Sequence, residues 1–229
     1  MVHLHSVGLH VFNRRAKCSR RIKVFKFIEF IHDMTLQTGD ILLFNEHPKS
    51  CLFWWIDSCI RWWTNSKYSH AGLVIVDPEW APKGTYVWDS SRHVHPDPQD
   101  HKVKFGIALV KIEDYLNDID GQQQLYKRSP KDQEVYKRFT PEKLRALHDK
   151  VYGKHYDLNP SHWIAGLLHS LIPRSTREFF CSAFVSYALT EMGVLHADTD
   201  WTVVSPAMLS QKCDRLHWLC PYTEEEKYP

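Results

Sequence analysis

A cysteine at the start of an apolar helix is the residue best suited to chemistry in this chain. Phe180, Phe184 and Tyr187 recur at helical spacing, so the pattern predicts a buried helix that opens near Phe180 and places Cys181 in its first turn. Unpaired backbone N–H groups and the positive end of the helix dipole lie there, and both stabilise a thiolate, the nucleophilic form of cysteine. Free cysteine is also often buried, so a core role for Cys181 stays open from this stretch alone.

A histidine far from this cysteine in sequence supplies the second chemical group. His70 leads directly into residues 71–76, an unbroken apolar run that is typical of a buried strand. A histidine at the mouth of a core strand can meet a cysteine at a helix start across a cleft. Cysteine and histidine that meet in space form a nucleophile and its base, and the sequence therefore suggests thiol catalysis.

The elements that must position these two residues alternate between strands and helices. We expect strands at residues 41–44, 71–76, 85–88, 107–112 and 122–128, and a loop at residues 91–98 because of its prolines. Thr140 and Pro141 are suited to the N-cap and first position of a helix that Gly153 ends. Apolar helices are expected at residues 51–63, 161–171 and 180–193. This mixed order predicts the α+β class.

Length and charge limit the organisation of the chain. At 229 residues and 27.0 kDa it fits one domain with appendages, which we place as a basic arm at residues 1–35, a catalytic domain at 36–212 and a tail at 213–229. The arm suits either a membrane-surface or nucleic-acid contact or, as we prefer, a solvated segment. A formal net charge of +2 does not by itself argue for a nucleic-acid partner.

Cysteine usage and apolar runs bear on the compartment. The six cysteines are irregularly spaced, which does not favour a disulfide framework. No apolar run reaches the ~18 residues of a membrane span, and the basic, histidine-rich start is unlike a secretory signal. We therefore expect a reducing, cytoplasmic location, with a virion or the membrane periphery as alternatives.

The order of these motifs is similar to that of a known family. The chain carries Gly-Asp-Ile-Leu-Leu-Phe at 39–44, Tyr-Ser-His-Ala-Gly-Leu-Val at 68–74, a strand ending in an acid at 89, Gly-Lys-His-Tyr-Asp at 153–157 and Phe-Cys-Ser at 180–182. This order resembles the circularly permuted NlpC-type papain-like cysteine hydrolases of bacteria and large DNA viruses, to which lecithin:retinol acyltransferases are related. The resemblance covers residues 36–209. It implies an antiparallel sheet of about five or six strands packed against helices, with the nucleophile at a helix N-terminus.

The resemblance also implies residue roles. Cys181 matches the nucleophile, His70 the base and Asp89 the acid that orients the histidine. Relatives often have glutamate where Asp89 stands, so His93 is the alternative third residue, because the acyltransferase branch uses a second histidine. The backbone N–H of Cys181 is the natural oxyanion donor. The expected substrate-binding residues are Tyr68 as a second donor, Tyr156 at the cleft edge, and Trp55 in the tryptophan-rich segment, which suits either a lipid-facing groove or the core.

The expected activity is cleavage of an amide or ester through a thioester acyl-enzyme, on a small acyl-lipid, N-acyl amino acid or peptide substrate. No cofactor, metal or nucleic acid is expected, and the oligomeric state stays open. Two alternatives remain: an acyltransferase like the lecithin:retinol enzyme, and a catalytically silent module that binds lipid or peptide. A zinc site built from Cys213, His217 and Cys220 is disfavoured, because structural zinc normally takes four ligands.

Overall fold

The structure, a computed structural model, describes residues 35–45, 66–118, 124–156, 178–210 and 216–228. The chain divides into two units, Met1–Thr35 and Leu36–Pro229, and every element described below belongs to the second. The N-terminal arm, the tryptophan-rich segment with Trp55 and the helix expected at 161–171 lie outside the described residues.

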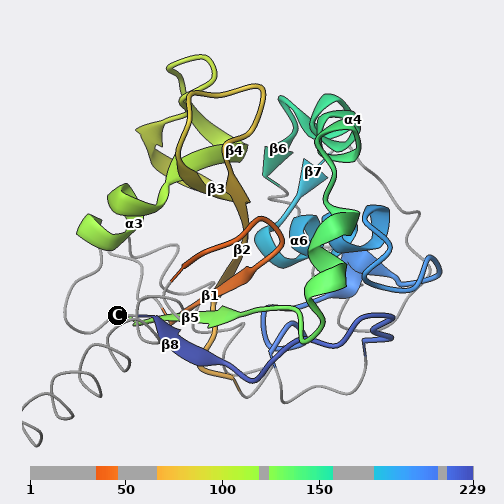
Figure 1. The fold of residues 1–229 in the computed structure, drawn as a ribbon. Helices are drawn as coiled ribbons and strands as arrows, with labels where there is room; N and C mark the ends of the chain where they lie inside the picture. Colours follow the sequence, from red (N-terminus) through yellow and green to blue (C-terminus); the bar gives the residue numbers. More distant parts are fainter. Residues whose placement is uncertain (1–34, 46–65, 119–123, 157–177, 211–215, 229) are drawn as a thin grey trace, which may run out of the picture. The chain divides into compact units, whose positions relative to one another are not determined.

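One sheet organises the second unit (Figure 1). Its strands run in the spatial order β7-β6-β4-β3-β2-β1-β5-β8, and neighbours pair antiparallel except β6 and β7, which are parallel. The bounds are β1 Ile41–Asn45, β2 His70–Val76, β3 Thr85–Pro96, β4 Val103–Lys111, β5 Gln124–Arg128, β6 His155–Tyr156, β7 Glu178–Phe179 and β8 Glu226–Tyr228. The α+β class is confirmed. The sheet has more strands than expected because β6, β7 and β8 are too short to leave a sequence pattern.

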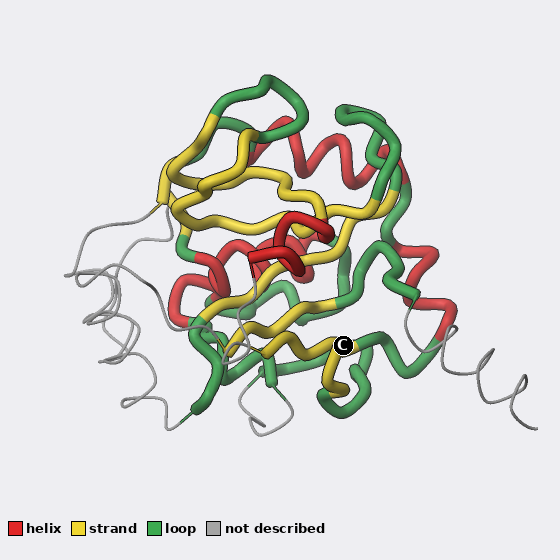
Figure 2. The backbone as a smooth tube through the Cα atoms, turned by 90° about the vertical axis from the view of Figure 1, so that its left-hand side faces the viewer, coloured by secondary structure: helices red, strands yellow, loops and turns green. Residues whose placement is uncertain are grey.

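The described helices are α3 (Ile112–Asp118), α4 (Pro141–Val151) and α6 (Cys181–Glu191), with 3-10 turns η1 (Gln133–Arg138) and η2 (Trp201–Val203) (Figure 2). The start of α4 is as predicted: the Thr140 side chain accepts a hydrogen bond from the Lys143 N–H, and Pro141 occupies the first turn. Helix α6 is confirmed with Cys181 as its first residue.

Two clusters of buried side chains result from strand alternation. Ile41 and Leu43 join the larger cluster, which includes the apolar side chains of α4 and α6, whereas Leu42 and Phe44 join a smaller one with Ile112 of α3. Each face of the central strands is therefore covered, and the strands are buried along nearly their whole length.

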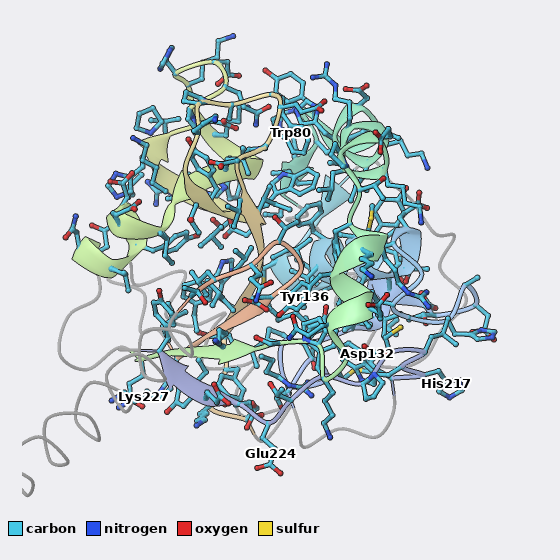
Figure 3. All side chains as sticks on the ribbon, viewed as in Figure 1. Trp80, Asp132, Tyr136, His217, Glu224 and Lys227 are labelled. Atoms are coloured by element: carbon cyan, nitrogen blue, oxygen red, sulfur yellow. The ribbon has the colours of Figure 1, made fainter. Side chains whose placement is uncertain are left out.

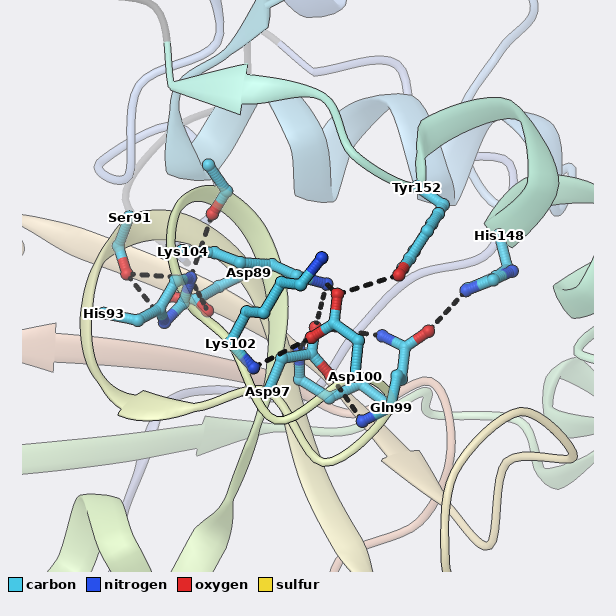
Figure 4. Close-up of polar contacts among 12 residues, drawn as sticks. Asp89, Ser91, His93, Asp97, Gln99, Asp100, Lys102, Lys104, His148 and Tyr152 are labelled. Atoms are coloured by element: carbon cyan, nitrogen blue, oxygen red, sulfur yellow. Dashed lines mark hydrogen bonds and ion pairs between the residues drawn. The ribbon is translucent and has the colours of Figure 1, made fainter.

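The expected loop at residues 91–98 is instead strand as far as Pro96. β3 keeps its pairing with β4 to Arg92 opposite Phe105, and a register shift between Arg92 and Pro96 absorbs the proline. The turn that follows is fixed by Asp97, which is fully buried and forms an ion pair with Lys104 at 2.7 Å. Gln99 in the same turn contacts His148 of α4 at 2.6 Å (Figure 4).

The described part of the expected C-terminal tail packs on the rest of the second unit. β8 pairs with β5, placing Lys227 opposite Tyr126, and the buried hydroxyl of Tyr222 donates to the Gly39 carbonyl. Asp40, the residue after Gly39, accepts a hydrogen bond of 2.7 Å from the hydroxyl of Tyr136 in η1. Tyr136 is labelled in Figure 3. These long-range contacts have no local sequence signal.

None of the helices in the described part of the chain has the length and apolar character needed to cross a lipid bilayer.

The contact between β4 and β6 predicts a specific need for glycine at residue 106. A Cβ on Gly106 would lie 2.2 Å from the Lys154 carbonyl oxygen, whereas a Cβ on Gly153 meets nothing within 4 Å, although both glycines have positive φ. We expect Gly153→Ala to lower the free energy of unfolding by about 1–2 kcal/mol through backbone strain. Gly106→Ala should cost about 1–3 kcal/mol more, because the clash is with backbone. Urea denaturation measures both free energies of unfolding. Equal losses in the two variants would contradict a close approach of Gly106 to the Lys154 backbone.

Candidate active site

Cys181 is held at the edge of the larger core by the helix that it begins. The ring of Phe184, one turn later, packs edge-on against Trp88 of β3 with centroids 5.0 Å apart, and Ser182 donates to the Val204 carbonyl at 2.6 Å. Phe180, the N-cap residue, provides no side-chain cap. The side chain of the N-cap residue therefore leaves the first N–H groups of α6 uncapped, and these groups lie next to the thiol. Cys181 itself is 6% exposed.

His70, the first residue of β2, lies between this thiol and a carboxylate. Its Nε2 is 2.5 Å from Asp89 Oδ2, and Cys181 lies close enough to influence the titration of its ring. Because Nε2 is engaged by Asp89, Nδ1 is the ring nitrogen left for the sulfur. Burial opposes the charged imidazole, but the charges of Cys181 and Asp89 and the hydrogen bonds to both raise the pKa of His70 well above its usual value.

Asp89 lies on β3, the strand next to β2, and is completely buried. Its Oδ2 accepts hydrogen bonds from His70 and, at 2.8 Å, from the Tyr115 hydroxyl. Burial favours the neutral acid, yet the pKa of Asp89 is lowered, because the charges of His93 and His70 and these two hydrogen bonds favour the carboxylate. The carboxylate is therefore ionised at neutral pH.

A missing side chain on β2 makes room for this arrangement. Gly72 lies between His70 and Val74 on the strand, and a Cβ there would be 2.3 Å from Val87 Cγ1 and 3.5 Å from Asp89 Cβ. Any larger residue would press against the strand that carries the carboxylate. The close approach of β2 and β3 at this point therefore depends on glycine.

His93, the alternative third residue, stands at the other oxygen of the carboxylate. Its Nε2 is 3.7 Å from Asp89 Oδ1 and 2.9 Å from the Gly106 carbonyl oxygen, and Ser91 Oγ approaches its ring (Figure 4). Asp89 therefore lies directly against His70, whereas His93 lies near the other carboxylate oxygen of Asp89.

The three expected substrate-binding residues have different outcomes. Tyr68 is buried in the larger cluster, where its ring packs edge-on against Tyr126 at 5.4 Å. The backbone of Tyr156 pairs with Phe179, two residues before Cys181, while its side chain lies outside the description, as does all of Trp55. Their roles stay predictions.

The proposed zinc ligands are only partly described. Cys220 is buried in the larger cluster, and His217 is exposed, while Cys213 lies outside the described residues. Within the ranges that the structure describes, no three histidine, cysteine or acidic residues are grouped so as to hold a metal ion.

Sequence reasoning did not identify Tyr115 or Phe44 as neighbours of the site. Phe44 looked like one more apolar residue of a buried strand, and Tyr115 lies in a single short helix after β4. Only the pairing of distant strands brings them to His70.

Comparison with models of known protein families and with curated proteins finds no match to this chain. The residues and their geometry therefore carry the functional argument.

The coupling of the thiol to the imidazole predicts how His70 titrates. Replacing Cys181 with alanine should lower the pKa of His70, because the charge on Cys181 is the strongest of the influences that raise it. The titration of the His70 ring, followed by NMR, measures the change. Cys220→Ala, which removes an equally buried thiol from the larger cluster, is the control and should leave the His70 titration as in the wild type.

The same shift has a consequence for stability. A folded-state pKa above the unfolded value means that the contribution of His70 to stability is complete below pH ~6.5 and is lost as the pH rises through the raised pKa. In Cys181→Ala this loss should be smaller. An unchanged pH dependence of unfolding, together with an unchanged His70 titration, would show that the two residues are not coupled.

Proposed function

We propose that this chain is a thiol hydrolase of the permuted papain-like kind, with Cys181 as nucleophile, His70 as acid and base, and Asp89 as the residue that orients His70. The observation that supports this most directly is the position of His70, between a thiol at a helix start and a buried, ionised carboxylate. Buried ionised groups are costly unless they are paired, and they gather at functional sites.

The chemistry follows from these positions. The Cys181 thiolate attacks the carbonyl carbon of an amide or ester, and the oxyanion that forms is stabilised by the N–H groups at the start of α6. His70 gives its proton to the leaving amine or alcohol, and a thioester remains on Cys181. His70 then takes a proton from water, which attacks the thioester and releases the acid. Asp89 keeps the imidazole in one orientation and stabilises its charged form throughout.

The substrate class comes from the family resemblance and is an acyl lipid, an N-acyl amino acid or a peptide. If an alcohol or amine replaced water in the second step, the same residues would make an acyltransferase. The catalytically silent alternative would keep the fold but needs no ionised imidazole beside a thiol. The position of His70 between Cys181 and Asp89, with its raised pKa, favours an enzyme over it.

Mass spectrometry of the intact protein tests the proposal. The wild type and Cys181→Ala are incubated with thioester, N-acyl amino acid and peptide libraries, with and without an added amine or alcohol. We expect an acyl adduct on Cys181 of the wild type, whose mass identifies the donor class. The released product then separates hydrolysis from transfer. Equal turnover by the two proteins would remove the mechanism.

Selective alkylation gives a substrate-free prediction. Cys181 and Cys220 are both 6% exposed, so access alone does not distinguish them. We expect iodoacetamide at pH 7 to modify Cys181 at least about tenfold faster than Cys220, because only a thiolate reacts and the imidazolium of His70 favours it. Peptide mapping measures both rates. Equal, slow modification of the two would favour the silent module.

Substitution of Asp89 tests its proposed orienting role. Asp89→Asn should lower kcat/KM by about 10²–10⁴-fold, because the amide can no longer stabilise the imidazolium. Asp198→Asn is the matched control: Asp198 also contacts a histidine, His196 Nδ1 at 2.6 Å, but on an exposed surface. Steady-state assays use the substrate that mass spectrometry identifies, and in these assays Asp198→Asn should have the wild-type kcat/KM.

A further inference from the structure

The hydroxyl of Tyr115 reaches the candidate site from α3, a helix that is distant in sequence from Cys181. Helix α3 follows β4, and its Tyr115 donates a hydrogen bond of 2.8 Å to Asp89 Oδ2. This is the same oxygen that contacts His70 Nε2 at 2.5 Å. One carboxylate oxygen therefore joins the imidazole to the phenol.

Phe44 provides a second connection between the rings of His70 and Tyr115. Phe44 of β1 lies 5.0 Å from the His70 ring, centroid to centroid, and 5.0 Å from the Tyr115 ring, tilted to both by 54° and 44°. Phe44 is fully buried, and its backbone lies opposite His70 in the β1–β2 register. The ring of His70 thus packs against Phe44 and is held at Nε2 by Asp89, and Tyr115 contacts both of these neighbours.

The carboxylate depends strongly on this phenol. Asp89 is completely buried, and within the described residues its Oδ1 has no hydrogen-bond donor, while His93 Nε2 lies 3.7 Å from it. The hydrogen bonds that satisfy the charge therefore converge on Oδ2. A buried carboxylate that loses one of two donors becomes markedly harder to keep ionised.

We propose that Tyr115 is a positioning residue, which holds the ionised carboxylate of Asp89 against His70 and so sets the lowest pH at which Cys181 reacts. The inference rests on the proposed function and adds a residue to it. The hydroxyl of Tyr115 donates to Asp89, and it acts on His70 through that carboxylate.

The direction of the effect follows from the groups that face Asp89. These are His70 from β2, His93 from β3 itself and Tyr115 from α3, with Cys181 of α6 beyond His70. The two histidines favour the carboxylate by charge, and the hydrogen bond from Tyr115 also lowers the pKa of Asp89. Without the phenol, Asp89 takes up a proton at a higher pH, and His70 then loses the charge that orients it.

The test is the pH profile of Cys181 alkylation by iodoacetamide in the full chain, with Tyr115→Phe compared with the wild type. Phenylalanine keeps the ring against Phe44 and removes only the hydroxyl. We expect the acid limb of the profile to move to higher pH, with a rate about three- to tenfold lower on that limb and recovery to the wild-type rate near pH 8. Tyr136→Phe is the matched control, because Tyr136 also donates to a buried aspartate, Asp40, away from this site.

The possible outcomes separate the two proposals. If wild-type Cys181 reacts selectively but Tyr115→Phe has the same profile, or loses rate equally at every pH, Tyr115 has no positioning role and the proposed function stands. If wild-type Cys181 shows no preference over Cys220, the proposed function fails first. Should Tyr115→Phe not fold, 3,5-difluorotyrosine placed at position 115 provides the opposite change. Its stronger hydrogen-bond donor should move the acid limb to lower pH, and an unmoved limb would overturn the inference.

Discussion

The structure around the site depends on one buried negative charge. Asp89 has no exposed surface, so its carboxylate is stable only because His70 and Tyr115 donate to it and His93 stands nearby. These partners come from β2, α3 and β3. The charge therefore makes the relative placement of three elements interdependent, and it also keeps the imidazole ready to share a proton with the thiol.

The two faces of the sheet support different residues of the candidate site. The larger cluster anchors α6 through contacts such as Phe184 against Trp88, and so fixes where the thiol lies. On the smaller face Phe44 and Tyr115 fix the ring of His70. The strand alternation that buries both faces thus provides separate supports for the thiol and the imidazole, and a substitution in one cluster should disturb one of these groups more than the other.

Local signals allowed much of this to be predicted from the sequence. Thr140 and Pro141 begin α4 as expected, and the apolar spacing after Phe180 placed Cys181 at a helix start. The failures are non-local. β3 extends to Pro96, where a loop was expected, because β4 pairs with it and His93 is buried. β8 forms by pairing with β5, which is far from it in sequence. The phenol of Tyr115 meets Asp89 across paired strands, a relation that spacing along one segment does not encode.

The connection between β2 and β3 is short, whereas the thiol arrives with α6 near the end of the second unit. During synthesis on the ribosome, the hairpin of β2 and β3, which carries His70 and Asp89, would therefore emerge well before Cys181. We expect His70 and Asp89 to be paired before α6 docks, so that Cys181 joins them only when most of the sheet has already been synthesised.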